Sequence, residues 1–258
     1  MNLKKLISKA YLRSKAQSSI SKGDLKSHSK LLTVILTYYN QVNVLEKQVK
    51  YWLDLAGDVT RRITFLIVDD GSEKSAAEAV KHVPNIDDLS LQIFRIHEDK
   101  YCNIGGARNL GSLVAFTEWI LHTDVDIVLR EDALRRILQI IGRDKRKIHR
   151  FNRQYENGST KIHPGTMLLP RSLYWEVGGC DEDFVGNYGQ TDVHFIYRAK
   201  KIVPVKTHKN IMLGFRSDGE TKEIDRSKLV PNEQLFMEKM ATGSWSSDFF
   251  RFTWSRVK

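Results

Sequence analysis

Cysteine and long apolar runs are the two features that this sequence has least of. Cys102 and Cys180 stand far apart and in no metal-ligand spacing, so we predict neither a disulfide framework nor a zinc site. No apolar run approaches the roughly 18 residues that span a bilayer, and Lys4 and Lys5 are not followed by the apolar core of a signal peptide. These features predict a cytoplasmic protein whose membrane contact, if there is one, is peripheral.

Acidic residues are scarce near the N-terminus, where most of the formal net charge of +10 arises. Residues 1–30 hold seven Lys and one Arg against Asp24 alone, a net charge of +7. Between Leu3 and Tyr11 apolar residues recur at helical spacing among these cations. Two interpretations stay open, a peripheral contact with an anionic membrane or a solvated helix packed on its own domain. We predict a basic arm and linker over 1–30.

Strand-like runs alternate with helical segments beyond this arm. Four short runs have the apolar, β-branched character of strands buried in a parallel sheet: residues 31–37, 63–68, 91–96 and 118–123. Segments with helical periodicity separate them, one from Val42 and one over 107–117. The alternation predicts an α/β fold, an open and mostly parallel Rossmann-like sheet flanked by helices. A single domain over 31–215 suits the length of the chain.

The last segment, residues 216–258, is rich in aromatic residues. Five of them lie close together, namely Trp245, Phe249, Phe250, Phe252 and Trp254. We predict a helical, aromatic C-terminal extension that packs on the core. An acceptor groove or a membrane contact are the alternatives for these rings.

Carboxylates follow two of the predicted strands. Asp69 and Asp70 come after residues 63–68, and Asp124 and Asp126 come after residues 118–123. Strand alternation points Asp124 and Asp126 the same way, and two converging carboxylates repel unless a cation joins them. Their hard oxygen atoms suit Mg²⁺ or Mn²⁺, which would keep positions open for a diphosphate.

A glycine-bearing turn enters the predicted helix of residues 107–117. The segment from Asn103 to Gly111 offers backbone N–H groups, a positive helix end and the guanidinium of Arg108, which together suit a diphosphate. Alternatively, the glycines only permit a tight turn and Arg108 pairs with an acid. The spacing matches neither the dinucleotide fingerprint nor the P-loop, so dehydrogenases and P-loop NTPases are excluded.

These motifs occur in one order and spacing: Thr37 to Asn40, Val68 to Ser72, Asn103 to Gly111, Asp124 to Asp126 and Gly178 to Glu182. The set resembles the family 2 glycosyltransferases over residues 31 to about 200. The resemblance implies a GT-A fold and an inverting, hexosyltransferase-type enzyme. It implies a nucleotide-diphosphate sugar donor, with uridine as the base, and a glycan, lipid-linked or other hydroxyl acceptor.

The resemblance also implies roles for single residues. The donor would contact Thr37, Tyr39, Asp70, Asn103, Gly105, Arg108 and Asp124. Within this set Arg108 would face the phosphates and Asp124 would lie near the ribose and sugar. Asp126 would bind Mn²⁺ or Mg²⁺, with Asp124 beside it. A simpler role for Asp69 or Asp70 is to cap the next helix.

A second part of the resemblance concerns the acceptor side. The segment from Gly186 to Arg198 is similar to the family's acceptor motif, with Thr191 where the family has Glu. It implies that Asp192 is the catalytic base, while a plain helix cap is the alternative. His208, after a strand expected at 201–205, is the candidate third metal ligand, in competition with His163 and His194.

Two other function classes compete with an enzyme. A binding module would keep the nucleotide-sugar or glycan pocket without turnover, and the Thr191 departure favours that alternative. A nucleic-acid-binding protein would use the basic arm, and its affinity would fall steeply with salt. We expect no nucleic-acid partner, because only about +3 of the charge lies outside the arm.

Overall fold

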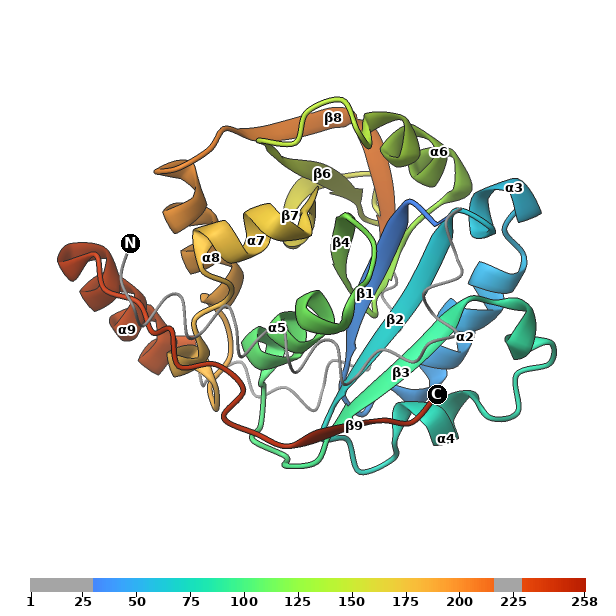
Figure 1. Ribbon diagram of the computed structural model, residues 1–258, viewed down its shortest axis with the longest axis horizontal. Helices are drawn as coiled ribbons and strands as arrows, with labels where there is room; N and C mark the ends of the chain where they lie inside the picture. The colour runs from blue at the N-terminus through green and yellow to red at the C-terminus, as the bar shows by residue number, and fades with distance from the viewer. Residues whose placement is uncertain (1–29, 216–228) are drawn as a thin grey trace.

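One mixed sheet with helices on both faces makes up the computed structural model, which describes residues 30–215 and 229–258 (Figure 1). The strands of these residues are β1 (Leu32–Tyr38), β2 (Ile63–Asp70), β3 (Leu91–Ile96), β4 (Trp119–Asp124), β5 (Ile127–Val128), β6 (Ile148–Gln154), β7 (Thr160–Pro170), β8 (Val205–Phe215) and β9 (Trp254–Arg256). Their order in the sheet is β5-β8-β6-β7-β4-β1-β2-β3-β9. The predicted basic arm, residues 1–29, lies outside the described residues.

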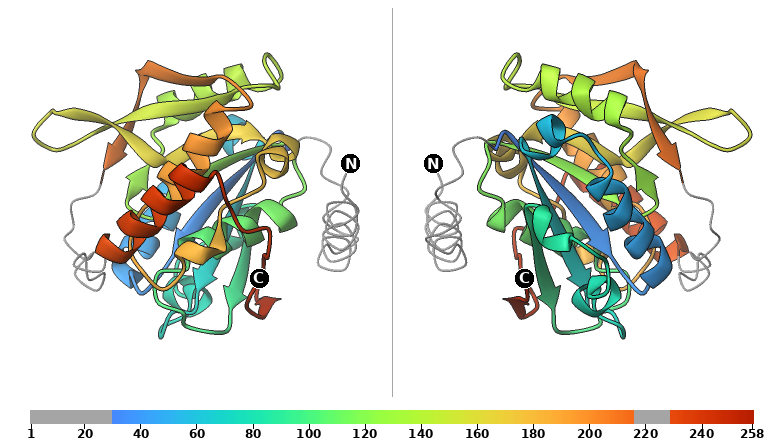
Figure 2. Two further views of the ribbon diagram at one scale, coloured as in Figure 1. Left: turned by 90° about the vertical axis from the view of Figure 1, so that its left-hand side faces the viewer. Right: turned by 90° about the vertical axis from the view of Figure 1, so that its right-hand side faces the viewer.

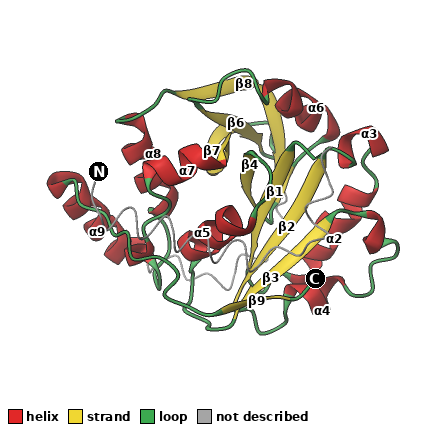
Figure 3. Ribbon diagram, viewed as in Figure 1, coloured by secondary structure: helices red, strands yellow, loops and turns green. Residues whose placement is uncertain are grey.

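Helices cover both faces of this sheet (Figure 3). They are α2 (Val42–Leu53), α3 (Gly57–Thr60), α4 (Ala76–Val80), α5 (Ile104–Val114), α6 (Glu131–Ile140), α7 (Arg171–Val177), α8 (Thr191–Lys200) and α9 (Leu229–Thr242), with short 3₁₀ turns at η2 (Ile86–Asp88) and η3 (Glu182–Phe184). No helix of the described residues is long and apolar enough to cross a membrane.

Strands β4, β1, β2 and β3 form the parallel centre of the sheet. Every residue of β1 is buried, because helices cover both faces of this central strand. Its alternate side chains enter two cores. Val34 and Leu36 pack with residues of α2, α4 and α6, and Ile35 packs with residues of α5, α7 and α8.

The predicted α/β fold, an open and mostly parallel sheet in a single domain, is confirmed. The strand expected at 91–96 has those bounds, while the helix expected at 107–117 begins earlier, at Ile104. Asn103 explains this start, because its side-chain oxygen accepts a hydrogen bond from Gly106 N at 3.1 Å and so caps the helix. Gly105 and Gly106 are therefore helical residues and not parts of a turn.

The strand predicted at 201–205 is wrong. Helix α8 continues to Lys200, and β8 starts only at Val205. Residues 202 and 203 form the turn that follows the helix, where Val203 N donates to Ala199 O at 2.9 Å. The apolar pair Ile202 and Val203 resembles a strand in sequence, but Val203 is buried against the α8 side of the core.

The C-terminal segment is only partly the predicted helical extension. Residues 229–242 form α9, but the aromatic part after it is extended, and β9 pairs antiparallel with β3 at the sheet edge. In Figure 1 this part runs from α9 past α5 to β3. Phe252 is 7% exposed in the core beside α5, as the predicted packing requires. The domain boundary at 215 stays a prediction, because residues 216–228 lie outside the described residues.

Helix α5 packs very closely against β1 at Gly111. A Cβ atom at Gly111 would meet Ile35 Cγ2 closer than real Cβ atoms come to a neighbour. We expect Gly111→Ala to lower the free energy of unfolding by about 1–3 kcal/mol, the usual cost of overpacking. Urea denaturation measures this change.

Gly57→Ala is the matched control for this substitution. A Cβ at Gly57 would meet only Arg61 Nη1, at an ordinary 3.6 Å, so its stability should stay within about 1 kcal/mol of wild type. Equal stability of the two variants would contradict the role of Gly111 in helix packing.

Candidate active site

A cavity of about 530 Å³ opens at the carboxyl ends of β1, β2 and β4. Strand order reverses around β1, which has β2 on one side and β4 on the other, and such switch points are where open α/β sheets bind ligands. Six of the predicted site residues line the cavity: Thr37, Tyr39, Asp70, Asp124, Asp126 and Asp192. Thr37 and Asp124 lie level with each other in the register of β1 and β4.

Arg108 was predicted to face the ligand, but it does not line the cavity. Its side chain is 1% exposed and lies buried beneath the cavity on α5. Its Nη2 donates to Asp124 Oδ1 at 2.7 Å, and its Nη1 forms an ion pair with Asp192 Oδ1. Of the two roles considered for Arg108, pairing with an acid is the one found in the structure. One guanidinium joins the strand-end carboxylate to the carboxylate of α8.

The charge of Asp124 depends on this guanidinium. Burial is the largest single effect and by itself would raise the pKa of Asp124, but Arg108, with smaller contributions from His163 and Arg153, outweighs it, and the pKa is lowered from its ordinary value. Asp124 is thus a carboxylate at neutral pH. Lowering the pH through this depressed pKa would protonate it and remove its ionic bond to Arg108.

An irregularity in β7 brings a histidine to the same carboxylate. Between the pairs Arg150–Met167 and Asn152–Ile162, β7 has more residues than β6, and His163 lies in this excess. His163 Nε2 lies 3.3 Å from Asp124 Oδ2, and burial lowers the pKa of His163 to about 4. The neutral ring can therefore donate a hydrogen bond to Asp124 without adding charge.

Gly165 makes room for this cluster. A Cβ at this position would lie 2.5 Å from Arg108 Nη2 and 2.8 Å from Asp124 Oδ2. Only glycine leaves space for the ion pair, which is why the β7 irregularity carries this residue.

The nucleotide side of the predicted site is built differently from expectation. Asp70 lines the cavity, and its Oδ2 accepts a hydrogen bond from Asn103 N at 2.7 Å. Burial raises the pKa of Asp70 well above its ordinary value, so its protonated form, which can donate a hydrogen bond, is favoured. Asn103 and Gly105 do not line the cavity. Asn103 caps α5, and a Cβ at Gly105 would lie 3.1 Å from Thr191 Cγ2.

Neither Asp69 nor Asp70 is the cap of α4, which is Ser75, but Asp69 supports the start of that helix. Asp69 is 1% exposed and accepts hydrogen bonds from Ser72 N at 3.0 Å and from Ala76 N at 2.8 Å. Ala76 is the first residue of α4, so Asp69 fixes the turn between β2 and that helix.

Asp192 lies in the first turn of α8 but does not cap it. The cap position is Gln190, in the left-handed region with φ of 65°, and its side chain makes no capping hydrogen bond. Asn232 of α9 holds the loop before this position. Its Nδ2 lies within 3.0 Å of three backbone oxygens, those of Phe184, Asn187 and Gly189. The carboxylate of Asp192 is therefore available to the cavity and to Arg108.

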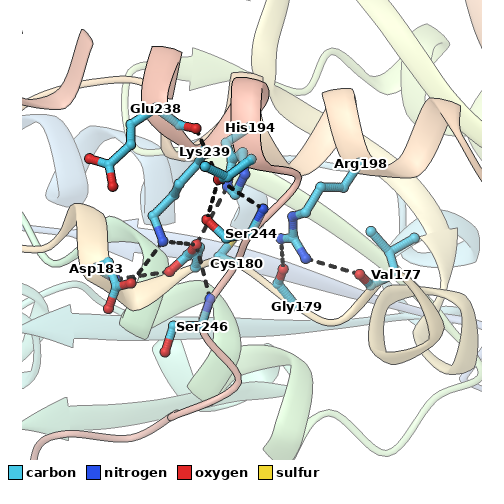
Figure 4. A network of polar contacts seen from close by, with 12 residues as sticks. Val177, Gly179, Cys180, Asp183, His194, Arg198, Glu238, Lys239, Ser244 and Ser246 are labelled. Carbon is cyan, nitrogen blue, oxygen red and sulfur yellow. Dashed lines mark hydrogen bonds and ion pairs between the residues drawn. The ribbon is translucent and has the colours of Figure 1, made fainter. Parts of the chain in front are cut away.

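A buried ionic network supports α8 from the other side (Figure 4). Lys239 of α9 contacts Asp181 Oδ2 at 2.9 Å and Asp183 Oδ2 at 2.8 Å, and Asp181 is fully buried. His194 of α8 lies 3.8 Å from Asp181 Oδ2, and burial lowers the pKa of His194 to about 4. Figure 4 shows Lys239, Asp183 and His194 together, with Arg198 of α8 beside them.

The acidic segment 181–183 does not reach the cavity. Asp181 and Asp183 bind Lys239, and Glu182 accepts hydrogen bonds from Asn109 Nδ2 at 2.9 Å and Phe250 N at 3.0 Å. All three carboxylates therefore join loops to the C-terminal segment. Asp192 is left as the acid of this region that lines the cavity.

His208, the predicted third metal ligand, is not placed with the carboxylates. It lies inside β8, its Nε2 is 2.9 Å from His149 Nδ1, and it lines a separate depression beside α6. No group of three or more His, Cys, Asp or Glu side chains that could hold a metal occurs in residues 30–215 and 229–258. The expected placement failed because β8 starts later than predicted, which moves His208 into a strand that pairs with β6.

Several cavity residues were not found from the sequence. The hairpin of β6 and β7 contributes Arg153, Tyr155 and Lys161 to the wall, beside His163, which the sequence had offered as a competitor of His208. Alternation was a usable signal here, because Tyr155, directly after the end of β6, is two residues from Arg153 and is therefore expected on the same face. No local pattern, however, indicates that the hairpin folds back over the strand ends.

The sequence and the fold both have known counterparts. The sequence model described as Glycosyl transferase family 2 matches residues 33–202. Residues 1–349 of S. aureus TarS in complex with UDP-GlcNAc superpose with a TM-score of 0.63 at 13% identity, covering 84% of this chain and 68% of that chain. No curated protein matches this sequence.

A second solved structure has the same architecture. The mannosyltransferase PcManGT from Pyrobaculum calidifontis, in complex with GDP-Man and Mn²⁺, has a TM-score of 0.61 and 16% identity. The match covers 94% of this chain and 74% of that chain. At these identities the two likenesses establish the GT-A fold.

The buried Lys239 generates a stability prediction. Lys239→Ala would leave Asp181 buried without its cation, so we expect a loss of about 3–5 kcal/mol in the free energy of unfolding. Lys50→Ala is the matched control, because Lys50 makes an exposed pair with Glu46 that is worth at most about 0.5 kcal/mol. Chemical denaturation of both variants measures the difference. Similar small losses would show that the network is not a structural support.

Proposed function

The chain belongs to glycosyl transferase family 2, and from this premise we propose that it transfers a hexosyl group, with inversion, from a nucleotide-diphosphate sugar to an acceptor hydroxyl. The carrying observation is that one guanidinium, Arg108, brings Asp124 and Asp192 together at one cavity. In this arrangement Asp124 would lie beside the donor, and Asp192, held by Arg108, would face the acceptor. The acceptor is a glycan, a lipid-linked sugar or another hydroxyl compound.

The donor would lie with its nucleoside against β1 and β2. Thr37, Tyr39 and Asp70 line this part of the cavity. The raised pKa of Asp70 supports the proposal, because the protonated form of this carboxyl can donate a hydrogen bond to a base carbonyl as well as accept one. TarS in complex with UDP-GlcNAc supports a uridine donor, and PcManGT with GDP-Man shows that the same fold also takes guanosine.

Asp124 and Asp126 suit a Mn²⁺ or Mg²⁺ ion whose remaining ligands would be oxygen atoms of the donor diphosphate. Asp124 and Asp126 line the cavity, and no larger cluster of ligands occurs in the described residues. Mg²⁺ is usually held by one or two carboxylates together with substrate phosphates, so two acids are enough. Bound there, the metal would stabilise the negative charge of the departing diphosphate. PcManGT, in complex with Mn²⁺, supports this assignment.

Asp192 would act as the general base. A sugar hydroxyl is a poor nucleophile at neutral pH, so a carboxylate within hydrogen-bond reach must accept its proton as the new bond forms. The acceptor oxygen then bonds to the anomeric carbon, and the bond from that carbon to the diphosphate oxygen breaks. The nucleoside diphosphate leaves with the bonding electrons, and the opposite approach inverts the anomeric configuration.

Arg108 would be a positioning residue in this reaction. Its guanidinium is buried, so it holds Asp124 and Asp192 without contacting a substrate. The two ion pairs fix the orientation of both carboxylates before a ligand arrives, and such preorganisation lowers the entropic cost of reaching the reacting geometry.

The first functional prediction concerns Asp192. Asp192→Asn keeps the size and an oxygen for Arg108 but cannot accept a proton, so turnover should fall about 10²- to 10⁴-fold. Donor affinity should stay close to wild type. Transfer assays with a panel of UDP-sugars and calorimetry with UDP measure the two quantities.

Asp132→Asn is the matched control for this prediction, because Asp132 also lies in the first turn of a helix, α6, and outside the cavity. It should leave turnover unchanged. Normal turnover in Asp192→Asn would reject Asp192 as the base, and absence of transfer by the wild type with every donor would favour a binding module.

The second functional prediction concerns Asp126 and the metal. We expect Mn²⁺ to raise the affinity of the wild type for UDP, because two carboxylates near a diphosphate repel it until a cation intervenes. Asp126→Ala should lose this Mn²⁺ effect while its affinity for uridine is unchanged. Titrations of UDP and uridine, with Mn²⁺ and with chelator, test this. A full Mn²⁺ effect in Asp126→Ala would place the metal elsewhere.

A further inference from the structure

A cationic wall faces the acidic side of the cavity, on the hairpin of β6 and β7. Figure 2 shows this hairpin projecting from the body of the molecule. Its residues Arg153 and Lys161 line the same cavity as Asp124, Asp126 and Asp192. The cavity is thus acidic at the ends of β4 and α8 and cationic at the hairpin.

Two aromatic rings hold the guanidinium of Arg153. Its central carbon lies 4.6 Å from the ring centre of Tyr155, directly after β6, and 4.6 Å from that of Phe215 on β8. The Tyr155 hydroxyl accepts a hydrogen bond from Arg153 Nη2. Stacking of this kind fixes the plane of a guanidinium while its remaining N–H groups can bind an anion. Arg153 is therefore ordered by contacts that leave its positive charge uncompensated.

Lys161 is placed directly opposite Arg153. The two residues pair across β6 and β7, so their side chains share one face of the hairpin. Like charges directly opposite each other on antiparallel strands destabilise the pairing. Neither cation makes an ion pair with a carboxylate of the described residues, although many other Lys and Arg residues of the chain do.

Three acids of the cavity have partners other than Arg153 and Lys161. Asp124 and Asp192 are joined to Arg108, and Asp70 accepts a hydrogen bond from Asn103. Arg153 nevertheless helps to lower the pKa of Asp124, so its charge is felt across the cavity. Two uncompensated cations that face a ligand cavity indicate a group of opposite charge in the ligand.

We infer that Arg153 and Lys161 form an anion subsite of this cavity, which binds a phosphate group of a substrate. The stacked guanidinium offers a flat pair of donors, which matches two phosphate oxygens, and the Lys161 ammonium adds a second charge from the facing strand. The inference rests on the proposed function for the identity of the substrates. Two sources share the chemistry: the diphosphate of the donor, or a phosphate carried by the acceptor.

Titration calorimetry with inorganic phosphate, UDP and uridine tests the subsite. Phosphate is titrated into the full-length protein and into protein saturated with UDP and Mg²⁺. The variants are Arg153→Gln and Lys161→Gln. Their matched controls are Arg130→Gln and Lys206→Gln, which remove one positive charge each from neighbouring segments outside the cavity lining. We expect each cavity variant to weaken phosphate binding to the free protein about tenfold or more, and the controls to leave it near wild type.

The two sources give different results in the saturated protein. If the donor diphosphate occupies the subsite, UDP and Mg²⁺ exclude phosphate, and both cavity variants weaken UDP binding but not uridine binding. If an acceptor phosphate occupies it, phosphate still binds the saturated protein, and the variants leave UDP binding unchanged.

Phosphate binding that is absent in the wild type, or equally strong in the cavity variants and their controls, would overturn the inference. The proposed function can fail separately. A wild type that binds phosphate through Arg153 and Lys161 but binds no nucleotide would retain the subsite and reject the nucleotide-sugar donor.

Discussion

The ion pairs of the buried Arg108 guanidinium are the interaction on which the rest of the site depends. They join β4 to α8, so the two carboxylates of the proposed site are positioned by one side chain. A buried cation of this kind is stable only with its carboxylates in place, because desolvation costs several kcal/mol for each unpaired ion. The neighbouring chain must therefore leave room for it, as Gly165 does, and must hold α8 at a fixed distance, as α9 and Lys239 do.

Much of the fold and part of the site follow from local sequence patterns. Strand-length apolar runs predicted β1 to β4, because strands covered on both faces need apolar residues without interruption. The strand-end acids Asp70, Asp124 and Asp126 could be placed together for a geometric reason. Parallel strands end at one edge of the sheet, and a pattern of strand followed by acid therefore predicts convergence.

The features that the sequence did not predict all depend on contacts between distant segments. Arg108 was expected at the phosphates, since a cation after a glycine-bearing segment suits them, but burial in α5 directs it to two acids instead. His208 lies away from the carboxylates because β8 starts later than predicted, and tertiary packing decides where that strand begins. The cationic face of the hairpin required knowing that β7 pairs with β4 on one side and β6 on the other. None of these pairings has a signature within a short window.

The C-terminal segment that ends in the edge strand β9 also affects the order in which parts of the protein can fold during synthesis. Thr253 hydrogen-bonds to Glu98, 155 residues away, and Phe250 and Arg251 donate to the buried Glu182. Contacts of such large sequence separation form slowly, because a long loop must close before they contribute. During synthesis the parallel centre of the sheet can assemble first. The loop of Glu182 then stays without its final partners until Phe250 and Arg251 have emerged, so the α8 side of the cavity is completed after the parallel centre of the sheet.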